Sequence, residues 1–140
     1  MAAKYWLVKS EPSVYGFEQL QTDRKTAWTG IRNYEARNNL KAMKPGDLAL
    51  YYHTGDEKQV VGVARVASHP QPDRTAKPSE DWVSVDLEAV AALKAPVTLS
   101  TVKATPTLAE FGLVKKGRIS VIPASSAEFK KILSLGKTKL

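Results

Sequence analysis

The apolar and polar positions of this chain follow two periods, which together predict short strands mixed with amphipathic helices. Period-two alternation of β-branched and aromatic residues favours strands, and apolar residues spaced by three and four favour helices. Proline and glycine mark the breaks between segments. The predicted strands are 4–10, 48–54, 59–67, 82–90 and 119–122, and the predicted helices are 14–22, 34–43 and two later ones that open near 107 and 125.

The best-defined motif is an antiparallel hairpin in the middle of the chain. Leu48–Thr54 and Gln59–Ala67 are both rich in strand-forming residues, and a four-residue polar link that contains Gly55 joins them. Lys44–Asp47 contains Pro and Gly, so it predicts the turn that leads into the hairpin. Gly62 lies inside the second strand, where glycine suits a bulge or a close backbone approach. Either feature helps a sheet to curl.

The other segments are predicted from local signals. The first strand should turn Trp6 and Val8 to one face and Leu7 to the other. A polar connection should then lead into Trp28, and the chain should turn helical from Pro96 onward. Thr107 and Ser125 each precede a glutamate by three residues, which is the spacing of a capping box. We expect Pro123 to stop the short strand before it, Gly136 to end the last helix, and 137–140 to form a flexible tail.

Composition limits the functions that the chain can have. Its 140 residues fit one domain, and 21 Lys+Arg against 14 Asp+Glu give a formal net charge of +7, which favours polyanionic partners. The absence of cysteine excludes disulfides, thiolate metal sites and cysteine nucleophiles. Two histidines cannot build a histidine-rich metal site, so we expect no metal and no cofactor. Because we find neither a signal segment nor an apolar run of about 20 residues, we expect a cytoplasmic protein without membrane contact.

The stretch from Thr26 to Lys44 contains the residues that most clearly suggest a function. It combines a tryptophan, three asparagines and several cations within nineteen positions, the materials that hold an extruded nucleotide. Asn33 should cap the helix within this stretch. The helix should bury an apolar stripe on one face and present cations on another. A solvated basic face on an ordinary helix is the alternative interpretation. The apolar stripe is Ala36, Leu40 and Met43, and the cations in line with Asn33 are Arg37, Lys41 and Lys44.

Several separated motifs resemble one known family. The runs YWLVKSEP, WTGIRNYEARNNLKAMKPGD, YYHTG, VVGVARV and GRISVIP occur in the order found in the EVE domain family, and the resemblance covers Tyr5 to about Leu133. It implies an α/β (α+β) single domain of the PUA-like group, a curled mixed β-barrel flanked by short helices, over residues 1–136. Relatives of the family include YTH domains, which recognise methylated adenine in RNA. The resemblance therefore implies a module that binds modified bases and has no catalysis of its own.

The resemblance and the residue chemistry together assign a candidate site. We expect one nucleotide to flip out into a pocket formed by the mouth of the first strand, Trp28 and the hairpin. In the family, a Tyr-Pro element in the region of the irregular loop 68–81 often helps to close this pocket. Here the loop is short and has His69-Pro70 instead, so His69 is either a stacking ring or a plain exposed loop histidine. The predicted base-binding residues are Ser10, Trp28, Thr29, Asn33, Tyr51, His53 and Trp82, and the predicted phosphate-binding residues are Lys9, Arg32, Arg37 and Lys41.

Other interpretations of these residues stay open. His53 also suits a structural, hydrogen-bonded histidine, and no Ser, Cys or carboxylate arrangement makes it a general base. An enzyme or a sensor of a small planar nucleoside-like ligand is the alternative function. The sequence does not distinguish DNA from RNA, or modified cytosine from modified adenine. We expect a monomer that binds nucleic acid.

Overall fold

A curled mixed sheet of seven strands forms the centre of the computed structural model, which describes residues 4–140. The strand order is β2-β6-β4-β3-β1-β7, and β5 pairs separately with β6. The strands are β1 (Tyr5–Ser10), β2 (Lys25–Trp28), β3 (Leu48–His53), β4 (Gln59–Val66), β5 (Gln71–Pro72), β6 (Val83–Thr98) and β7 (Val121–Ala124). The helices are α1 (Pro12–Tyr15), α2 (Phe17–Asp23), α3 (Tyr34–Ala42), α4 (Leu99–Ala104), the 3₁₀ helix η1 (Pro106–Leu108), α5 (Gly112–Lys115) and α6 (Ser126–Leu135).

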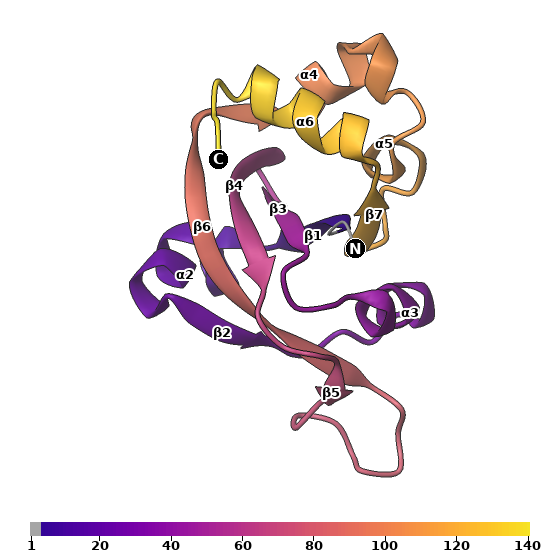
Figure 1. Cartoon of the computed structure of the whole chain (residues 1–140). Helices are drawn as coiled ribbons and strands as arrows, with labels where there is room; N and C mark the ends of the chain where they lie inside the picture. The colour runs from indigo at the N-terminus through magenta and orange to yellow at the C-terminus, as the bar shows by residue number, and fades with distance from the viewer. Residues whose placement is uncertain (1–3) are drawn as a thin grey trace.

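The helices cover the edges and ends of this sheet. Figure 1 shows α6 lying across one end of the curled sheet, whereas α3 lies at the side of the sheet below β7 and the loop around β5 projects away. β1 runs parallel to β3 and antiparallel to β7, and the remaining pairs are antiparallel. The predicted mixed, curled sheet with short flanking helices is therefore confirmed. None of the helices within 4–140 has the length and apolar character needed to cross a membrane.

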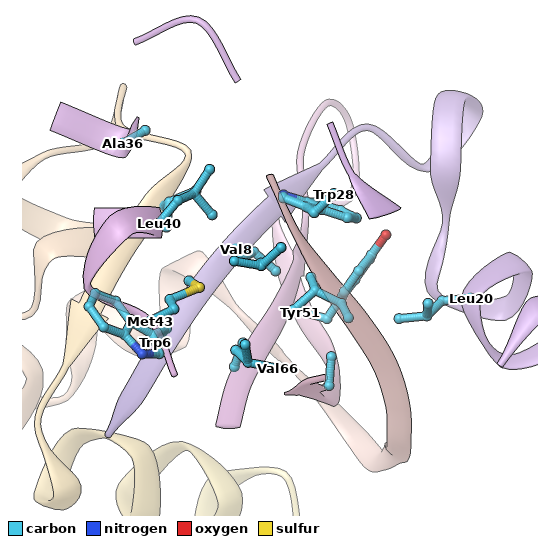
Figure 2. Close-up of a cluster of buried hydrophobic side chains, with 14 of the residues drawn as sticks. Trp6, Val8, Leu20, Trp28, Ala36, Leu40, Met43, Tyr51 and Val66 are labelled. Carbon is cyan, nitrogen blue, oxygen red and sulfur yellow. The ribbon is translucent and has the colours of Figure 1, made fainter. Parts of the chain in front are cut away.

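β1 is buried on both faces, because the curled sheet encloses one core and the C-terminal helices cover another. Trp6 and Val8 pack in the core that also holds Trp28 and Tyr51 (Figure 2). Leu7 points into the second core, beneath α6. The predicted division of β1 side chains between two faces is thus confirmed, and the strand's C-terminal end at Ser10 is held in a fixed position.

The predicted helix at 34–43 is confirmed as α3, with its cap. The Asn33 side chain accepts a hydrogen bond from the Ala36 N–H at 2.9 Å, which satisfies one of the exposed donors of the first turn. The apolar stripe formed by Ala36, Leu40 and Met43 is buried against the sheet. Gly46 then adopts a φ of +96° in the turn after the helix, a conformation that favours glycine.

The predicted hairpin is confirmed as β3 and β4, and its register shifts beside Gly62. Tyr51 pairs with Gly62, but the next residue, Tyr52, pairs with Val60, so one residue of β4 bulges out. A Cβ atom built on Gly62 would lie 2.5 Å from the Phe17 ring of α2. Glycine is therefore required here because a helix lies directly on the bulged strand.

One strand was not predicted, and another was predicted too short. Lys25–Trp28 was expected to be a polar connection and a loop, but it forms β2 by pairing with β6, with Trp28 opposite Val85. The strand predicted at 82–90 continues to Thr98 and passes through Pro96. This proline lies where the β4–β6 register shifts, and proline is tolerated at such bulges.

Other predicted boundaries were wrong for local reasons. The helix expected over 14–22 is split into α1 and α2 by Gly16, whose backbone is extended. The capping box expected at Thr107 does not form, because this residue lies inside the 3₁₀ helix. Pro123 does not stop β7 but belongs to it, since β7 is an edge strand and needs no further N–H donor there.

The C-terminal signals gave a better prediction. The capping box between Ser125 and Glu128 is confirmed, and Gly136 ends α6 as predicted. The Thr138 hydroxyl accepts a hydrogen bond from Lys94 N at 2.9 Å and donates one to Gly136 O at 2.8 Å. These contacts tie the start of 137–140 to β6, and the flexibility of that segment stays a prediction, as does the domain end at 136.

The contact between Gly62 and Phe17 generates a stability prediction. Gly62→Ala should lower the free energy of unfolding by about 1–3 kcal/mol, because the added methyl group overlaps the buried Phe17 ring and forces it to shift. Gly117→Ala is the matched control, since a Cβ there meets no atom within 4 Å. Urea unfolding of both variants and the wild type checks this, and equal stabilities of the two variants would contradict it.

Candidate functional site

A cavity of about 460 Å³ opens at the end of β1. Its walls come from the last residues of β1, from α1, from β2 and from the loop that follows β2. The strand pairing β1–β3 and β2–β6 places these segments together although they are separate in sequence. The lining residues are Lys9, Ser10, Glu11, Val14, Tyr15, Thr26, Ala27, Trp28, Thr29, Ile31 and Arg74.

Trp28 forms the aromatic wall of this cavity. This residue is only 8% exposed, because most of it packs into the core beneath the site. The ring meets Tyr51 edge-on, with centroids 5.5 Å apart, and Tyr15 in the same manner at 6.4 Å (Figure 2 shows Trp28 and Tyr51). The buried indole Nε1 has no hydrogen-bond partner among the described residues. An unpaired buried donor costs about 1–3 kcal/mol, so this indole lowers the stability of the fold.

Two hydroxyl groups near the cavity are already used within the protein. Ser10 Oγ donates to the Tyr15 carbonyl at 2.7 Å, and the Tyr51 hydroxyl donates to the same carbonyl at 2.8 Å. Burial raises the pKa of Tyr51 to about 12, so this hydroxyl stays protonated at neutral pH. The shared carbonyl fixes α1 against the mouth of β1. The shape of this wall is therefore set before any ligand arrives.

The loop after β2 and the loop 68–81 meet at the edge of the cavity, which we call its lip. The carboxylate of Asp73 holds this lip together. This buried side chain accepts hydrogen bonds from Gly30 N at 2.8 Å and from Arg32 Nη1 at 3.0 Å. Its other oxygen accepts from the Thr75 N–H and hydroxyl. Burial by itself raises the pKa of Asp73, but the hydrogen bonds from Thr75, Gly30 and Arg32 outweigh it and hold the pKa at about 2.

These bonds join the loop after β2 to the loop 68–81. Gly30 has a φ of +84°, which glycine adopts readily and which turns its N–H towards Asp73. Arg74, which directly follows Asp73 in the chain, lines the cavity. The short loop therefore does supply part of a wall, through an arginine, whereas His69 is exposed and is not among the lining residues.

The cavity brings together some of the predicted site residues and excludes others. Lys9, Ser10, Trp28 and Thr29 line it. Tyr51 lies beneath Trp28 and is fully buried. The remaining predicted base-binding residues, which are Asn33, His53 and Trp82, lie outside the cavity lining.

His53 holds the hairpin to α2. Its Nε2 accepts from the Phe17 N–H at 3.0 Å, so Nδ1 carries the proton and donates to Glu57 at 2.9 Å. The hydrogen bond from His53 lowers the pKa of Glu57. Both nitrogens are thus engaged, and the ring faces a separate cavity of about 560 Å³ beside Gly16 and Phe17.

The predicted phosphate-binding cations are all engaged as well. Lys9 Nζ donates to Gly117 O at 2.6 Å, and burial lowers the pKa of Lys9. Arg32 pairs with Asp73, and Arg37 and Lys41 both lie within ion-pair distance of Asp81. Their role in binding phosphate stays a prediction.

Sequence reasoning missed Tyr15, Asp73 and Arg74. Tyr15 matters through its backbone carbonyl, which no residue-type signal could find. Asp73 and Arg74 lie in an irregular loop, which the pairing of β5 with β6 and the bonds of Asp73 to Gly30 and Arg32 bring to the cavity. An aspartate followed by a threonine two residues later is a turn signal that could have drawn attention to Asp73.

A curled mixed barrel with short flanking helices is the architecture expected of the PUA-like group. The model of the EVE domain family matches residues 4–135, and the chain belongs to that family. Within 4–140, no group of three or more His, Asp or Glu residues is placed to hold a metal ion.

Proteins with known names or structures are similar over nearly the whole chain. Thymocyte nuclear protein 1 of Gallus gallus is 31% identical, over 96% of this chain and 69% of that protein. A protein of Agrobacterium tumefaciens solved by crystallography is 40% identical, with a TM-score of 0.94 over 97% of this chain and 94% of the other. Human THYN1 protein, solved in complex with DNA that contains 5-methylcytosine, is 29% identical, with a TM-score of 0.88 over 99% of this chain and the whole of that one.

The Asp73 network predicts a pH-dependent loss of stability. Because the folded pKa is about 2, the carboxylate contributes stability that is complete above its unfolded pKa of about 3.9 and is lost as the pH falls towards 2. Asp73→Asn should lower the free energy of unfolding at pH 7 by about 2 kcal/mol. The difference from wild type should shrink between about pH 4 and 2.

Urea unfolding at a series of pH values measures this difference. Asp81→Asn is the matched control, because that exposed carboxylate also pairs with cations and has a lowered pKa, caused first by its hydrogen bond with Lys41. It should change stability little. An Asp73→Asn difference that stays constant down to pH 2 would contradict the assignment.

Proposed function

We propose that this protein is a non-catalytic nucleic-acid-binding module that reads one modified nucleobase in the cavity beside Trp28. The observation that carries the proposal is this preformed aromatic cavity, in a family where human THYN1 has been solved with DNA containing 5-methylcytosine. A modified cytosine is accordingly the first candidate for the base, and DNA is the first candidate for the polymer. Modified adenine and RNA are the further candidates.

The dimensions and the lining of the cavity support a base as its guest. A volume of about 460 Å³ falls in the range of pockets that enclose small organic ligands, about 300–1,000 Å³. Trp28 and Ala27 offer apolar contact to a planar ring and its methyl group, and Thr26 and Thr29 offer hydroxyls to its polar edge. A base inside a duplex cannot reach such a cavity, so the nucleotide must be unpaired or flipped out.

Charge supports nucleic acid over a free nucleoside. The formal net charge is +7, and the exposed Arg74 lies on the cavity wall itself. Phosphates next to the bound nucleotide would be attracted to this face, so affinity should fall as salt rises. Arg32, Arg37 and Lys41 lie on the segment that follows the cavity lip and would extend this contact along the strand.

The absence of catalysis is also part of the proposal. His53, the residue best suited to acid–base work, has both ring nitrogens bonded inside the fold. The proposed recognition of a modified base requires binding and no chemical step. We further propose that the protein acts as a monomer and, as the sequence suggested, in the cytoplasm.

Filling the cavity should remove base recognition. We expect the wild type to bind a single-stranded DNA oligonucleotide with one central 5-methylcytosine more tightly than its unmodified twin. Thr29→Trp should abolish that preference, because the new indole occupies the space of the base. Weak, salt-sensitive binding should persist in this variant because the cations are unchanged. Fluorescence anisotropy with labelled oligonucleotides measures both affinities.

Thr107→Trp is the matched control, since it makes the same change on an exposed residue of η1 outside the cavity lining. It should retain the preference. If methylcytosine gives no difference in affinity from the unmodified oligonucleotide, the same assay with methylated adenine and with RNA identifies the bound base. Equal affinity for every modified and unmodified oligonucleotide, with no effect of Thr29→Trp, would contradict the proposal.

A further inference from the structure

We propose that Tyr34 and Trp82 form a second, exposed stacking platform, which holds a nucleobase adjacent in the strand to the one in the cavity. This inference rests on the proposed function and extends it from one nucleotide to its neighbour. It assigns Trp82 a place on the surface rather than in the cavity, and it adds Tyr34, which no motif had singled out.

The two rings are stacked on one another. Their centroids are 5.2 Å apart and their planes are inclined by 22°. Tyr34 is the first residue of α3, and Trp82 directly precedes β6. Tyr34 is 67% exposed even though one face of its ring lies on Trp82. Its opposite face is consequently turned to solvent and can receive another flat ring.

Two guanidinium groups flank the stacked rings. Arg37 lies 5.0 Å from the Tyr34 centroid and 5.8 Å from that of Trp82. Arg32 lies 5.7 Å from the Trp82 centroid. Each arginine is also held by an aspartate, Asp81 or Asp73. A base on the exposed face of Tyr34 would thus bring its phosphate close to cations that are already oriented.

The fold itself does not require an aromatic residue at position 34. The Asn33 cap and the buried stripe of α3 already hold this helix in place. Ion pairs from Arg37 and Lys41 to Asp81 already link α3 to the segment before β6. A large ring left in water beside these links costs hydrophobic free energy, and a base stacked on it would recover part of that cost.

The platform directly adjoins the cavity. Ile31 lines the cavity, and the next residue, Arg32, contacts Trp82. On the other loop Arg74 lines the cavity, and its neighbour Asp73 binds Arg32. A nucleic-acid strand that leaves the cavity over this lip therefore passes Arg32 and reaches the rings of Tyr34 and Trp82. Since every base has a π face, the platform should add affinity without adding base preference.

The experiment compares Tyr34→Ala with wild type on two single-stranded DNA oligonucleotides of equal length, each with one 5-methylcytosine. In the first, ordinary bases flank the modified base, and in the second, abasic sites flank it. Tyr34→Ala should weaken binding to the first by about 5- to 150-fold, the range expected for one lost stacking contact. It should leave binding to the second unchanged. Tyr34→Phe, which keeps the ring, should behave as wild type on both.

The outcomes separate this inference from the proposed function. Equal losses on both oligonucleotides, or no loss on either, would overturn the platform while the wild-type preference for methylcytosine still stands. Equal wild-type affinity for every modified and unmodified oligonucleotide, DNA and RNA, would defeat the proposed function itself, whatever Tyr34→Ala does. Urea unfolding of Tyr34→Ala should give a free energy close to wild type, and a large drop would overturn the inference by giving Tyr34 a structural role.

Discussion

The carboxylate of Asp73 holds two loops together at the point where they meet. One oxygen binds the loop after β2 through Gly30 and Arg32, and the other closes the turn at Thr75. The cavity lip and the approach to the Tyr34–Trp82 platform both depend on these bonds. A buried charge is stable only when its hydrogen bonds are complete, so the two loops cannot shift independently without exposing an unpaired carboxylate.

The curled sheet determines where those loops begin. β1 is buried on both faces between β3 and β7, so its end at Ser10 has little freedom. β2 pairs with β6, and this pairing brings Trp28 over Tyr51 of β3. The bulge at Gly62 lets α2 lie directly on the sheet, which positions α1 at the mouth of β1. A rigid scaffold thus carries a site built mainly of strand ends and loops.

The sequence predicted those elements whose signals are local. The cap at Asn33, the buried stripe of α3, the hairpin and the capping box at Ser125 all depend on residues within one turn or one link of each other. β2 could not be predicted, because its four residues form a strand only through pairing with a segment about sixty positions later. Family resemblance led us to group Trp28 with Ser10, and both line the cavity, but their role in binding a base stays a prediction.

Other parts of the site were inaccessible to the same reasoning. Trp82 and Tyr34 are far apart in sequence, and neither one predicts the other as a partner. Asp73 binds Gly30 and Arg32, which are 43 and 41 positions away in sequence, so its importance appears only after folding. Asn33 and His53 have side chains that suit a ligand, but backbone N–H groups nearby use their acceptors first.

The most direct test of the central claim is the set of indole N–H signals in a ¹⁵N-correlated NMR spectrum, recorded while an oligonucleotide with one 5-methylcytosine is added. The three tryptophans occupy distinct places: Trp28 lines the cavity, Trp82 lies on the surface, and Trp6 donates to buried Asp47 and serves as an internal control. We predict that the Trp28 signal moves, that it moves more for the modified than for the unmodified strand, and that the Trp6 signal stays in place. Tight binding of the modified strand with an unmoved Trp28 signal would contradict the account, because the base would then be read elsewhere.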